Sequence, residues 1–441
     1  MQQNTTEIFR DAPVPKAVLS NVIPSIISMI MVLIYNLADT FFIGQTKNAL
    51  MVAAVSVATP AFLLFMAVGM LFGIGGTSFI SRMLGEGQEE RAKHASAFCF
   101  WTGLAVGIIS MILIVIFAEP VCKAIGASPD TIEYATQYLR IVAIGIPFLI
   151  ISNAFSNIIR SEGRAKTAMS GMIIGNMANV ILDPVMILLL GWNVAGAAIA
   201  TVIAQGISVV LCLIYIVTKA KILLPEKRHF ALDRGLYADL LAQGFSMGFM
   251  SSIIYVGSIV LQPGINSLGY ETIAGHTAAR KLFSFSMMPL SSMAQAVNTY
   301  VAQNRGADNW ERVRKGIRYA YIFCFSVTAC LIVIVTPLAP TMVHLISGSS
   351  DPIVLGNGAR YLRVAIPFFF ALGLVNCSRL ALQALGEKIL PLLSSFIELF
   401  GKIIFAMVFI PRYHYSAVIW CEPIIWCFMA VELVISLYRN P

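Results

Sequence analysis

Residues 17–43 read AVLSNVIPSIISMIMVLIYNLADTFFI, an apolar run whose single charged side chain is Asp39. A helix needs about 20 largely apolar residues to cross a bilayer, so this run is long enough to span one. It follows a polar start, MQQNTTEIFRDAPVPK, and is too long for the apolar part of a cleaved signal peptide. The run therefore predicts a transmembrane helix that carries a carboxyl group within its span.

The rest of the chain continues this pattern. Of its 441 residues, 58% are hydrophobic and 12% are charged, and the mean hydropathy is +0.82. Soluble proteins carry roughly 25% charged residues, so much of this chain must have lipid as its solvent. Further apolar runs cover residues 52–82, 95–117, 134–159, 167–190, 195–218, 237–262, 272–302, 317–344, 359–384, 389–410 and 415–438. These runs predict an all-α integral membrane protein with twelve transmembrane helices.

Most of the 30 Lys and Arg residues fall in alternate loops between these runs. Basic residues concentrate in the cytoplasmic loops of membrane proteins. Both termini are therefore expected in the cytoplasm, which requires an even number of spans. The polar N-terminus without a targeting peptide, and the lack of long tails, favour a bacterial inner membrane. We expect the protein to act there as a monomer.

The two halves of the sequence resemble each other with a period of about 221 residues. GEGQEERAK at 85–93 recurs as GADNWERVR at 306–314, and YLR at 138–140 recurs at 361–363. Six helices per half bring both halves into the membrane from the same side, so a pseudo-twofold axis along the membrane normal should relate the two bundles, with a cavity between them. The expected domains are an N-lobe at 1–218, a basic cytoplasmic linker at 219–235 and a C-lobe at 236–441.

Two acidic residues inside predicted spans, Asp39 and Asp183, are the sharpest indication of function. A charge at the bilayer centre costs about 2.5–3.5 kcal/mol on insertion scales, so it seldom lies there without partners or a task. Both spans run outward and each acid precedes the outer end by several residues, so the two should reach a similar depth. The opposing interpretation is that each Asp caps a helix end or, before Pro184, belongs to a turn.

Helical spacing places polar side chains on the same stripe as each acid. Carboxylates, amides and a hydroxyl together can hold a proton or an alkali cation. The predicted coupling site consists of Asp39, Asp183, Asn179, Thr201, Tyr35, Asn36, Asn157 and Asn153. A sodium ion would bind at the first four of these residues, and no other metal or cofactor is expected.

The second half has no acid at the positions equivalent to Asp39 and Asp183. Polar residues in its spans, with one amide from the first half, are candidates for a substrate cavity; contacts within the bundle are the alternative. The candidates are Asn176, Gln262, Asn266, Arg280, Met287, Gln295, Asn298 and Glu398. Glu398 lies four residues before Lys402, so these two could neutralise each other. Pro24 could bend the first helix.

The sequence lacks the motifs that mark several other classes of protein. No GxxxxGK[ST] loop is present, which argues against an ATP-driven pump, and no HExxH or GxSxG pattern indicates an enzyme. Eight scattered cysteines form no CxxC pair, so they are expected to be buried thiols. The net charge is +8, but most of the charged residues lie in the loops between apolar runs, so nucleic acid is not an expected partner. A secondary transporter of small molecules is the remaining class.

The segments YNLADTFFIG at 35–44, SRMLGEG at 81–87 with AQNRGA at 302–307, and the paired YLR…PF segments resemble the MATE (multidrug and toxic compound extrusion) family. The resemblance covers essentially the whole chain and favours the prokaryotic DinF-like and MepA-like branch. It implies antiport, in which H⁺ or Na⁺ enters while organic cations, often aromatic, leave through a V-shaped pair of lobes. It also implies that Asp39 and Asp183 carry the coupling ion.

The leading hypothesis is thus a multidrug efflux transporter that antiports organic cations against H⁺ or Na⁺ by alternating access. A flippase for lipid-linked oligosaccharides, from the same superfamily, is the alternative, and a more strongly cationic central cavity would favour it. In the NorM-like branch, acids also occur in the seventh and tenth helices. Here the seventh has none near residues 249–251 and the tenth has Asn376, which argues against a second ion site.

Overall fold

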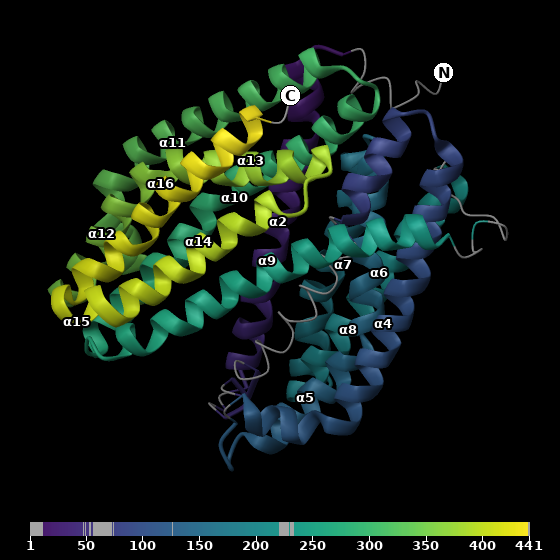
Figure 1. Cartoon of the computed structure of the whole chain (residues 1–441). Coiled ribbons are helices and arrows are strands. Elements are labelled where there is room, and N and C mark those ends of the chain that lie inside the picture. The colour runs from purple at the N-terminus through teal and green to yellow at the C-terminus, as the bar shows by residue number, and fades with distance from the viewer. Residues whose placement is uncertain are drawn as a thin grey trace. The chain divides into compact units, whose positions relative to one another are not determined.

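The computed structural model describes residues 12–46, 48, 50–52, 54–55, 73, 75–125, 127–219, 229 and 233–439, and all regular structure in them is helical. Figure 1 labels most of the elements. In chain order they are α2 (Val14–Gly44), α4 (Glu89–Ala124), α5 (Ile132–Ile144), α6 (Ile146–Ser161), α7 (Ala165–Asp183), η1 (Pro184–Leu189), α8 (Asn193–Thr218), α9 (Arg234–Asn266), α10 (Tyr270–Gly306), α11 (Trp310–Ser347), α12 (Pro352–Ala365), η4 (Ile366–Phe368), α13 (Phe369–Leu385), α14 (Leu390–Ile404), η5 (Phe405–Phe409), α15 (Ile410–Tyr413) and α16 (Tyr415–Arg439).

These helices agree with the predicted spans. Within the described residues, nine helices, some made of segments joined end to end, are long and apolar enough to cross a membrane. Helices α5 and α6 are long and apolar enough only when taken together, and they meet at a bend of 46°. The run predicted at 272–302 is α10, which carries more polar residues than the others, and the run predicted at 52–82 lies mostly outside the described residues. The all-α membrane fold is confirmed.

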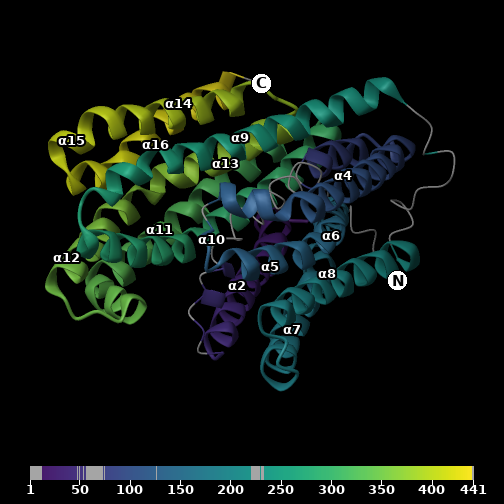
Figure 2. The same cartoon turned by 90° about the horizontal axis from the view of Figure 1, so that it is seen from below.

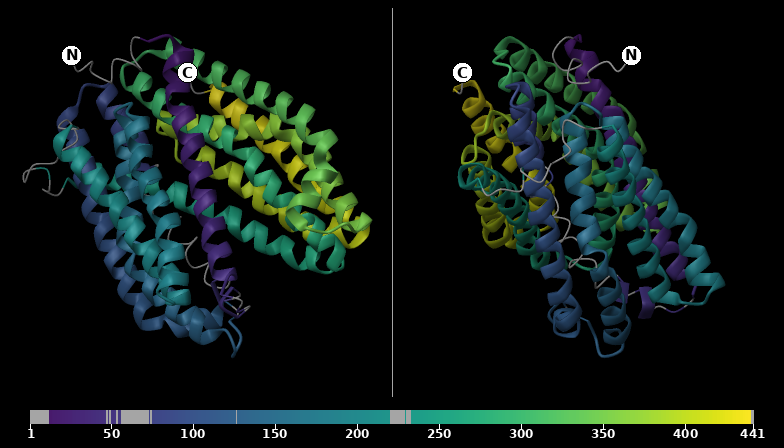
Figure 3. Two further views of the ribbon diagram at one scale, coloured as in Figure 1. Left: turned by 180° about the vertical axis from the view of Figure 1, so that it is seen from behind. Right: turned by 90° about the vertical axis from the view of Figure 1, so that its right-hand side faces the viewer.

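The chain divides into two compact units, one formed by Ile23–Gly248 and the other by Phe249–Pro441 with Ile8–Val22. In the first unit α6 packs against α4, α7 and α8 (Figure 3). In the second unit α10 packs against α11, α12 and α13, while α16 packs against α13 and α14 (Figure 2). The lobe boundaries derived from the sequence stay a prediction.

Both halves break a span at the repeated YLR…PF motif. In the first half α5 ends and α6 begins on either side of Gly145, with Pro147 in the first turn of α6. In the second half the short turn η4, which contains Pro367, separates α12 from α13. Proline lacks the N–H that an interior helical position donates, and its ring clashes with the preceding turn. The repeated proline therefore explains why both halves break at this point.

Two π-helical turns recur as well, since η1 begins at Pro184 and η5 at Phe405, about 221 residues apart. A π turn adds a residue to one helical turn and is frequent at functional sites. Element η1 follows directly on Asp183, and Pro184 supplies no backbone donor there. The chain stays helical at this point, so the interpretation of Asp183 as part of a turn is wrong.

Close packing of α7 against α8 depends on a glycine. A Cβ atom at Gly175 would lie 2.7 Å from the carbonyl oxygen of Ala204, which is closer than real Cβ contacts. Transmembrane helices associate largely through such close backbone approach at small residues, because lipid tails compete with apolar packing. Gly175 thus brings together the two helices that carry Asp183 and Thr201. Pro24 lies inside α2, and whether it bends this helix stays a prediction.

The turn between α6 and α7 contains an unusually placed acid, Glu162. Glu162 is 3% exposed, and neither of its carboxylate oxygens has a hydrogen-bond partner among the described residues. Among the described residues its ion-pair partner is Arg164, whose Nε lies 3.8 Å from Oε2. Burial raises the pKa of Glu162 from 4.5 to about 7, and the charge of Arg164 opposes this shift only in part. The folded protein therefore favours the protonated form of Glu162.

This shift predicts how stability changes with pH. The folded state binds the Glu162 proton more tightly than the unfolded state does, so this proton stabilises the folded protein. The stabilisation is complete below pH 4.5, and roughly 3 kcal/mol of it is lost as the pH rises to 7. Glu162→Gln should abolish this loss, so its thermal midpoint in detergent should fall less than that of the wild type between pH 5 and 8. Glu311→Gln, at an exposed pair with Lys315, is the control and should keep the wild-type slope.

Candidate functional site

Asp39 and Asp183, the two acids predicted to couple an ion gradient to transport, are both buried. Asp39 lies near the end of α2 and is 8% exposed, while Asp183 is the last residue of α7 and is fully buried. Charged groups within spans usually face a bundle interior and pair with other groups or carry protons and ions. The contacts of the two acids decide between these roles.

Asn179 lies between Asp183 and Thr201. Its Nδ2 is 3.4 Å from Oδ1 of Asp183 and 3.5 Å from Oγ1 of Thr201, both long hydrogen bonds. The Thr201 hydroxyl donates its own proton to the carbonyl oxygen of Ala197 at 3.0 Å, so its oxygen is free to accept. The structure thus brings together the amide, the hydroxyl and the acid that the sequence predicts.

The side chains of Asp39 and Asp183 are close enough to interact directly, and Asn179 donates to Asp183. Ionised carboxylates only accept hydrogen bonds, and two of them at close range repel each other. A proton or a cation between the two acids removes this repulsion. The pair is therefore suited to bind one.

Tyr138 of α5 is a further member of this site that sequence reasoning missed. Its phenol group interacts electrostatically with Asp39, Asp183 and Tyr35. The signal that could have revealed it is the repeated YLR motif, because Tyr138 is the first residue of that motif. A phenol can donate a hydrogen bond to a carboxylate, so Tyr138 is a candidate partner for whichever acid is ionised.

A cavity of about 70 Å³ lies within the first half and is lined by Asn179 and Thr201, although by neither acid. One water molecule takes up about 30 Å³ in the liquid, so this space suits a small ion with a water rather than a drug. Its polar lining includes five predicted site residues, Tyr35, Asn153, Asn176, Asn179 and Thr201. Among the described residues, Oδ1 of Asp39, Oδ2 of Asp183 and Oδ1 of Asn179 are buried without a hydrogen-bond partner.

Three unpartnered oxygens from two carboxylates and one amide are a suitable ligand set for a hard cation or a proton. Hard cations prefer carboxylate and carbonyl oxygens, and buried polar atoms seldom remain without partners. The residues present therefore fit either H⁺ or Na⁺. The turn η1 supports this arrangement, because it changes the helical register directly after Asp183.

Comparison with known proteins identifies the family. The model of the MatE family matches residues 24–185 and 247–408, which is most of the chain. This chain belongs to the MatE family. The two matched stretches also confirm the internal duplication, and membership makes the chain a transporter and not an enzyme, as predicted.

The similar proteins agree with this family over their full length. A multidrug export protein MepA from Staphylococcus saprophyticus is 25% identical, covering 100% of this chain and 97% of the relative. The MepA protein of Staphylococcus haemolyticus is 26% identical, covering 98% of this chain and 95% of the relative. A crystal structure of a MATE protein in complex with MaL6 superposes with a TM-score of 0.93, at 23% identity, covering 100% of this chain and 98% of that one.

Two predicted members of the coupling site contact the backbone instead. The side-chain amide of Asn153 donates to the backbone carbonyl oxygen of Leu149, and that of Asn157 donates to the backbone carbonyl oxygen of Asn153. Asn153 still lines the cavity, whereas Asn157 does not. The side chain of Asn36 lies outside the described part of the structure. Helical backbone carbonyls satisfy the two amides, so they are weaker candidates than Asn179.

The predicted substrate residues of the second half do not form one group. Gln262 donates to Asn266 at 2.7 Å, and Glu398 accepts from Lys402 at 2.8 Å, as predicted for that pair. Arg280 lines a polar cavity in this half together with Gln262. Three others, Met287, Gln295 and Asn298, lie on α10 and line neither this cavity nor that of the first half.

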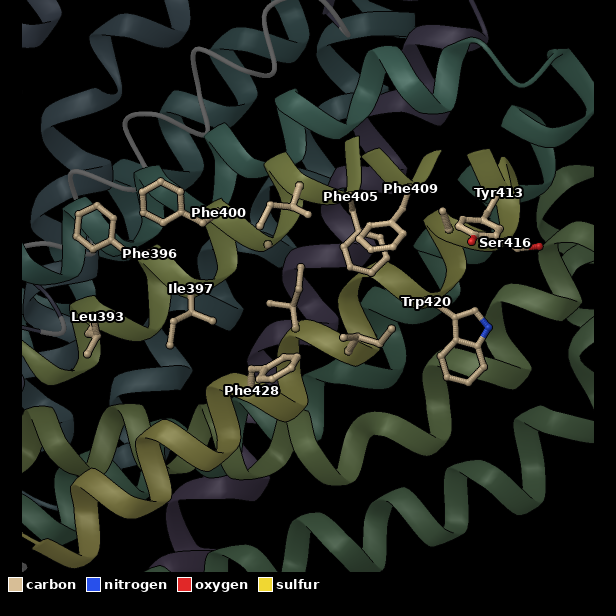
Figure 4. A pocket seen from close by; sticks show the side chains of 15 residues that line it. Leu393, Phe396, Ile397, Phe400, Phe405, Phe409, Tyr413, Ser416, Trp420 and Phe428 are labelled. Carbon is tan, nitrogen blue, oxygen red and sulfur yellow. The ribbon is translucent and has the colours of Figure 1, made fainter. Parts of the chain in front are cut away.

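A larger cavity, of about 800 Å³, lies along α14 and α16 and is almost wholly apolar. Figure 4 shows its aromatic lining, which includes Phe396, Phe400, Trp420 and Phe428. Among its lining residues only Tyr413 and Ser416 carry a hydroxyl group and Trp420 an indole N–H, and none carries a charge. Apolar surfaces of this kind on spanning helices are suited to lipid chains. The polar cavity lined by Asn179 and Thr201 is therefore the better candidate site, although it is smaller.

The role of Thr201 can be tested with a matched threonine on the same helix. Thr201→Val keeps the shape of the side chain but removes the oxygen that Asn179 uses, which should weaken binding of the coupling ion about threefold to tenfold. Thr218→Val, on exposed α8 surface with the same bond to a preceding carbonyl, is the control. The measurement is the ion concentration that gives half-maximal transport, and equal values for both variants would contradict a role for Thr201.

Proposed function

We propose that this chain is a multidrug exporter that drives the outward movement of small organic cations by the inward movement of H⁺ or Na⁺ through Asp39 and Asp183. Family membership supports the class of transporter, and the two staphylococcal relatives are named multidrug export proteins. The coupling mechanism is supported by the geometry of the buried site in the first half.

The observation that carries this proposal is the pair of buried acids that interact directly with each other. Structural acids inside a membrane protein are normally neutralised by a basic residue. No Lys or Arg forms an ion pair with either acid among the described residues. An exchangeable cation is the remaining way to balance their charge.

Binding of H⁺ or Na⁺ removes part of the negative charge of the acid pair, and release restores it. Asn179 holds the carboxyl group of Asp183 in place during both states, and Thr201 in turn holds Asn179, since these hydrogen bonds do not require the ion. The unloaded site would attract an organic cation, and the loaded site would not. Alternation between these two states couples the ion gradient to export.

The expected substrates are small aromatic cations, which match the negative charge of the unloaded site. The protein would work as a monomer in the inner membrane of a bacterium, with both termini in the cytoplasm. This orientation is supported by the concentration of Lys and Arg in alternate loops.

A flippase for lipid-linked oligosaccharides stays the alternative. Three basic residues inside the second half, Arg280, Arg379 and Lys402, are the observation in its favour. Each of them has an acidic neighbour in the same half, so together they do not make the strongly cationic cavity that a flippase would need. The coupled exporter is therefore the better supported function.

Substitution of each acid tests the coupling. Asp39→Asn and Asp183→Asn preserve side-chain size but cannot bind and release the ion, so each should reduce gradient-driven ethidium efflux from proteoliposomes to below roughly a tenth of the wild-type rate. Separate H⁺ and Na⁺ gradients identify the ion. The control is Asp351→Asn at the N-cap of α12, where Asn caps as well as Asp. Wild-type efflux that ignores both gradients would refute antiport and favour the flippase.

A further inference from the structure

The second half contains a polar cavity of its own, of about 290 Å³, lined by α9, α10, α12 and α16. Its main polar groups are Gln262, Arg280, Tyr361 and Glu422. Two of these are predicted substrate residues, whereas Tyr361 and Glu422 are brought beside them only by the fold. The cavity is several times larger than that beside the acid pair, so it has room for an organic molecule.

Arg280 is the charged group in the wall of this cavity that has unused hydrogen-bonding capacity. Its Nη1 donates to Oε2 of Glu422 at 2.6 Å and to the hydroxyl of Tyr361 at 2.9 Å. The guanidinium group also lies 4.8 Å from the ring centre of Phe283. These contacts hold the side chain in one orientation.

The other edge of the Arg280 guanidinium, formed by Nε and Nη2, has no hydrogen-bond partner among the described residues. The Arg280 side chain is 36% exposed, and it lines the cavity, so this edge is accessible. The two N–H groups along one edge of a guanidinium match the two oxygens of a carboxylate. The structure therefore presents an oriented donor pair without an acceptor.

Glu422 cannot also serve the free edge, because a second cation holds it. Its Oε1 lies 3.8 Å from Nζ of Lys402, which is 2.8 Å from Oε1 of Glu398. Lys402 is almost fully buried and packs closely on α9, where a Cβ atom at Gly257 would lie 2.8 Å from its Cδ. Glu422 is thus held between two cations and contacts Arg280 only at Nη1.

The charges of this half form a ladder of alternating sign that begins at the cavity with a cation. After Glu398 comes Arg379, whose Nη2 lies 4.0 Å from Oε2 of Glu398. The remaining acid, Glu432, interacts with Arg379 at the far end and accepts a hydrogen bond from Ser436. The ladder as a whole is balanced, and Arg280 is its basic member in the cavity wall.

The rest of the lining suits a flat, partly apolar ligand. Leu261, Ile265 and Val418 supply apolar surface. The ring of His276 lies edge-on to Tyr361 at 5.0 Å between centres, and its Nδ1 lies 3.3 Å from the hydroxyl of Tyr415. No acidic side chain other than Glu422 lines the cavity within the described residues.

We propose that this cavity binds the carboxylate of a small aromatic acid, or of a zwitterionic aromatic substrate, on the free Nε and Nη2 edge of Arg280. The inference rests on the proposed function in one respect, since it takes the bound molecule to be a transport substrate. It adds a contact for a carboxylate that the acid pair of the first half cannot provide.

The test compares two small probes that differ only in charge, 2-naphthoate and its neutral isostere 2-naphthamide. Their binding to the purified full chain is measured by calorimetry in detergent without an ion gradient. The wild type should bind the carboxylate about tenfold more tightly than the amide, because charge-assisted bidentate bonds are stronger than neutral ones. The double variant R280Q/E422Q removes both charges of the pair and should lower this ratio to about one.

Two further variants keep the test decisive. Arg280→Lys retains the charge and the pairing with Glu422 but loses the second edge, so it should lower the preference for the carboxylate probe. It serves as the test if the double variant does not fold. Lys281→Gln, at the exposed neighbouring cation on α10, should leave the ratio at its wild-type value. Equal binding of both probes by the wild type, or a preference that persists in R280Q/E422Q and R280K, would overturn the proposal.

The outcome is separable from that of the efflux test. Probe binding is measured without a gradient, and ethidium carries no carboxylate. If the wild type binds both probes equally but exports ethidium in response to a gradient, only the carboxylate site is refuted. If the wild type prefers 2-naphthoate but its efflux ignores both gradients, only the coupling is refuted.

Discussion

Lipid offers no hydrogen bonds, so every backbone N–H and C=O group within a span must be satisfied inside the chain. This constraint explains why all regular structure in the described residues is helical and why interruptions are few. Two kinds of interruption occur in both halves. A proline near the YLR motif breaks a span in each half, and π turns begin at Pro184 and Phe405. Duplicated irregularities indicate that the breaks are inherited features of the repeat and are not local accidents of sequence.

The same solvent constrains charge. Each charge in the second-half ladder has a neighbour of opposite sign, as in the contacts of Lys402 with Glu398 and Glu422. The first half instead holds two acids without a basic partner among the described residues. A balanced ladder has no need of an external ion, whereas an unbalanced acid pair requires one. The two halves thus share a fold but differ in the kind of ligand that each can exchange with solvent.

Local sequence patterns were sufficient for much of this architecture and for the core of the first site. Asp183 and Asn179 lie four residues apart on one helix, so helical spacing alone places them together, and long apolar runs predict the spans. Tyr138 and Glu422 were missed for a different reason. Their contacts join residues far apart in the chain, such as Arg280 and Glu422, and only tertiary packing determines such pairs. The π turns were missed because no periodicity of side chains marks them.

The repeat offers a reason why both polar sites contain a tyrosine. Tyr138 and Tyr361 begin the same motif, and each lies beside the buried charges of its own half. A phenol can donate to an acid and accept from a base, so one inherited residue serves an acid pair in one half and an Arg–Glu pair in the other. Divergence then required changes only in the residues around the tyrosine. On this reading the duplicated scaffold fixes where charge can be buried, and the charges acquired there decide whether a half exchanges an ion or binds an anion.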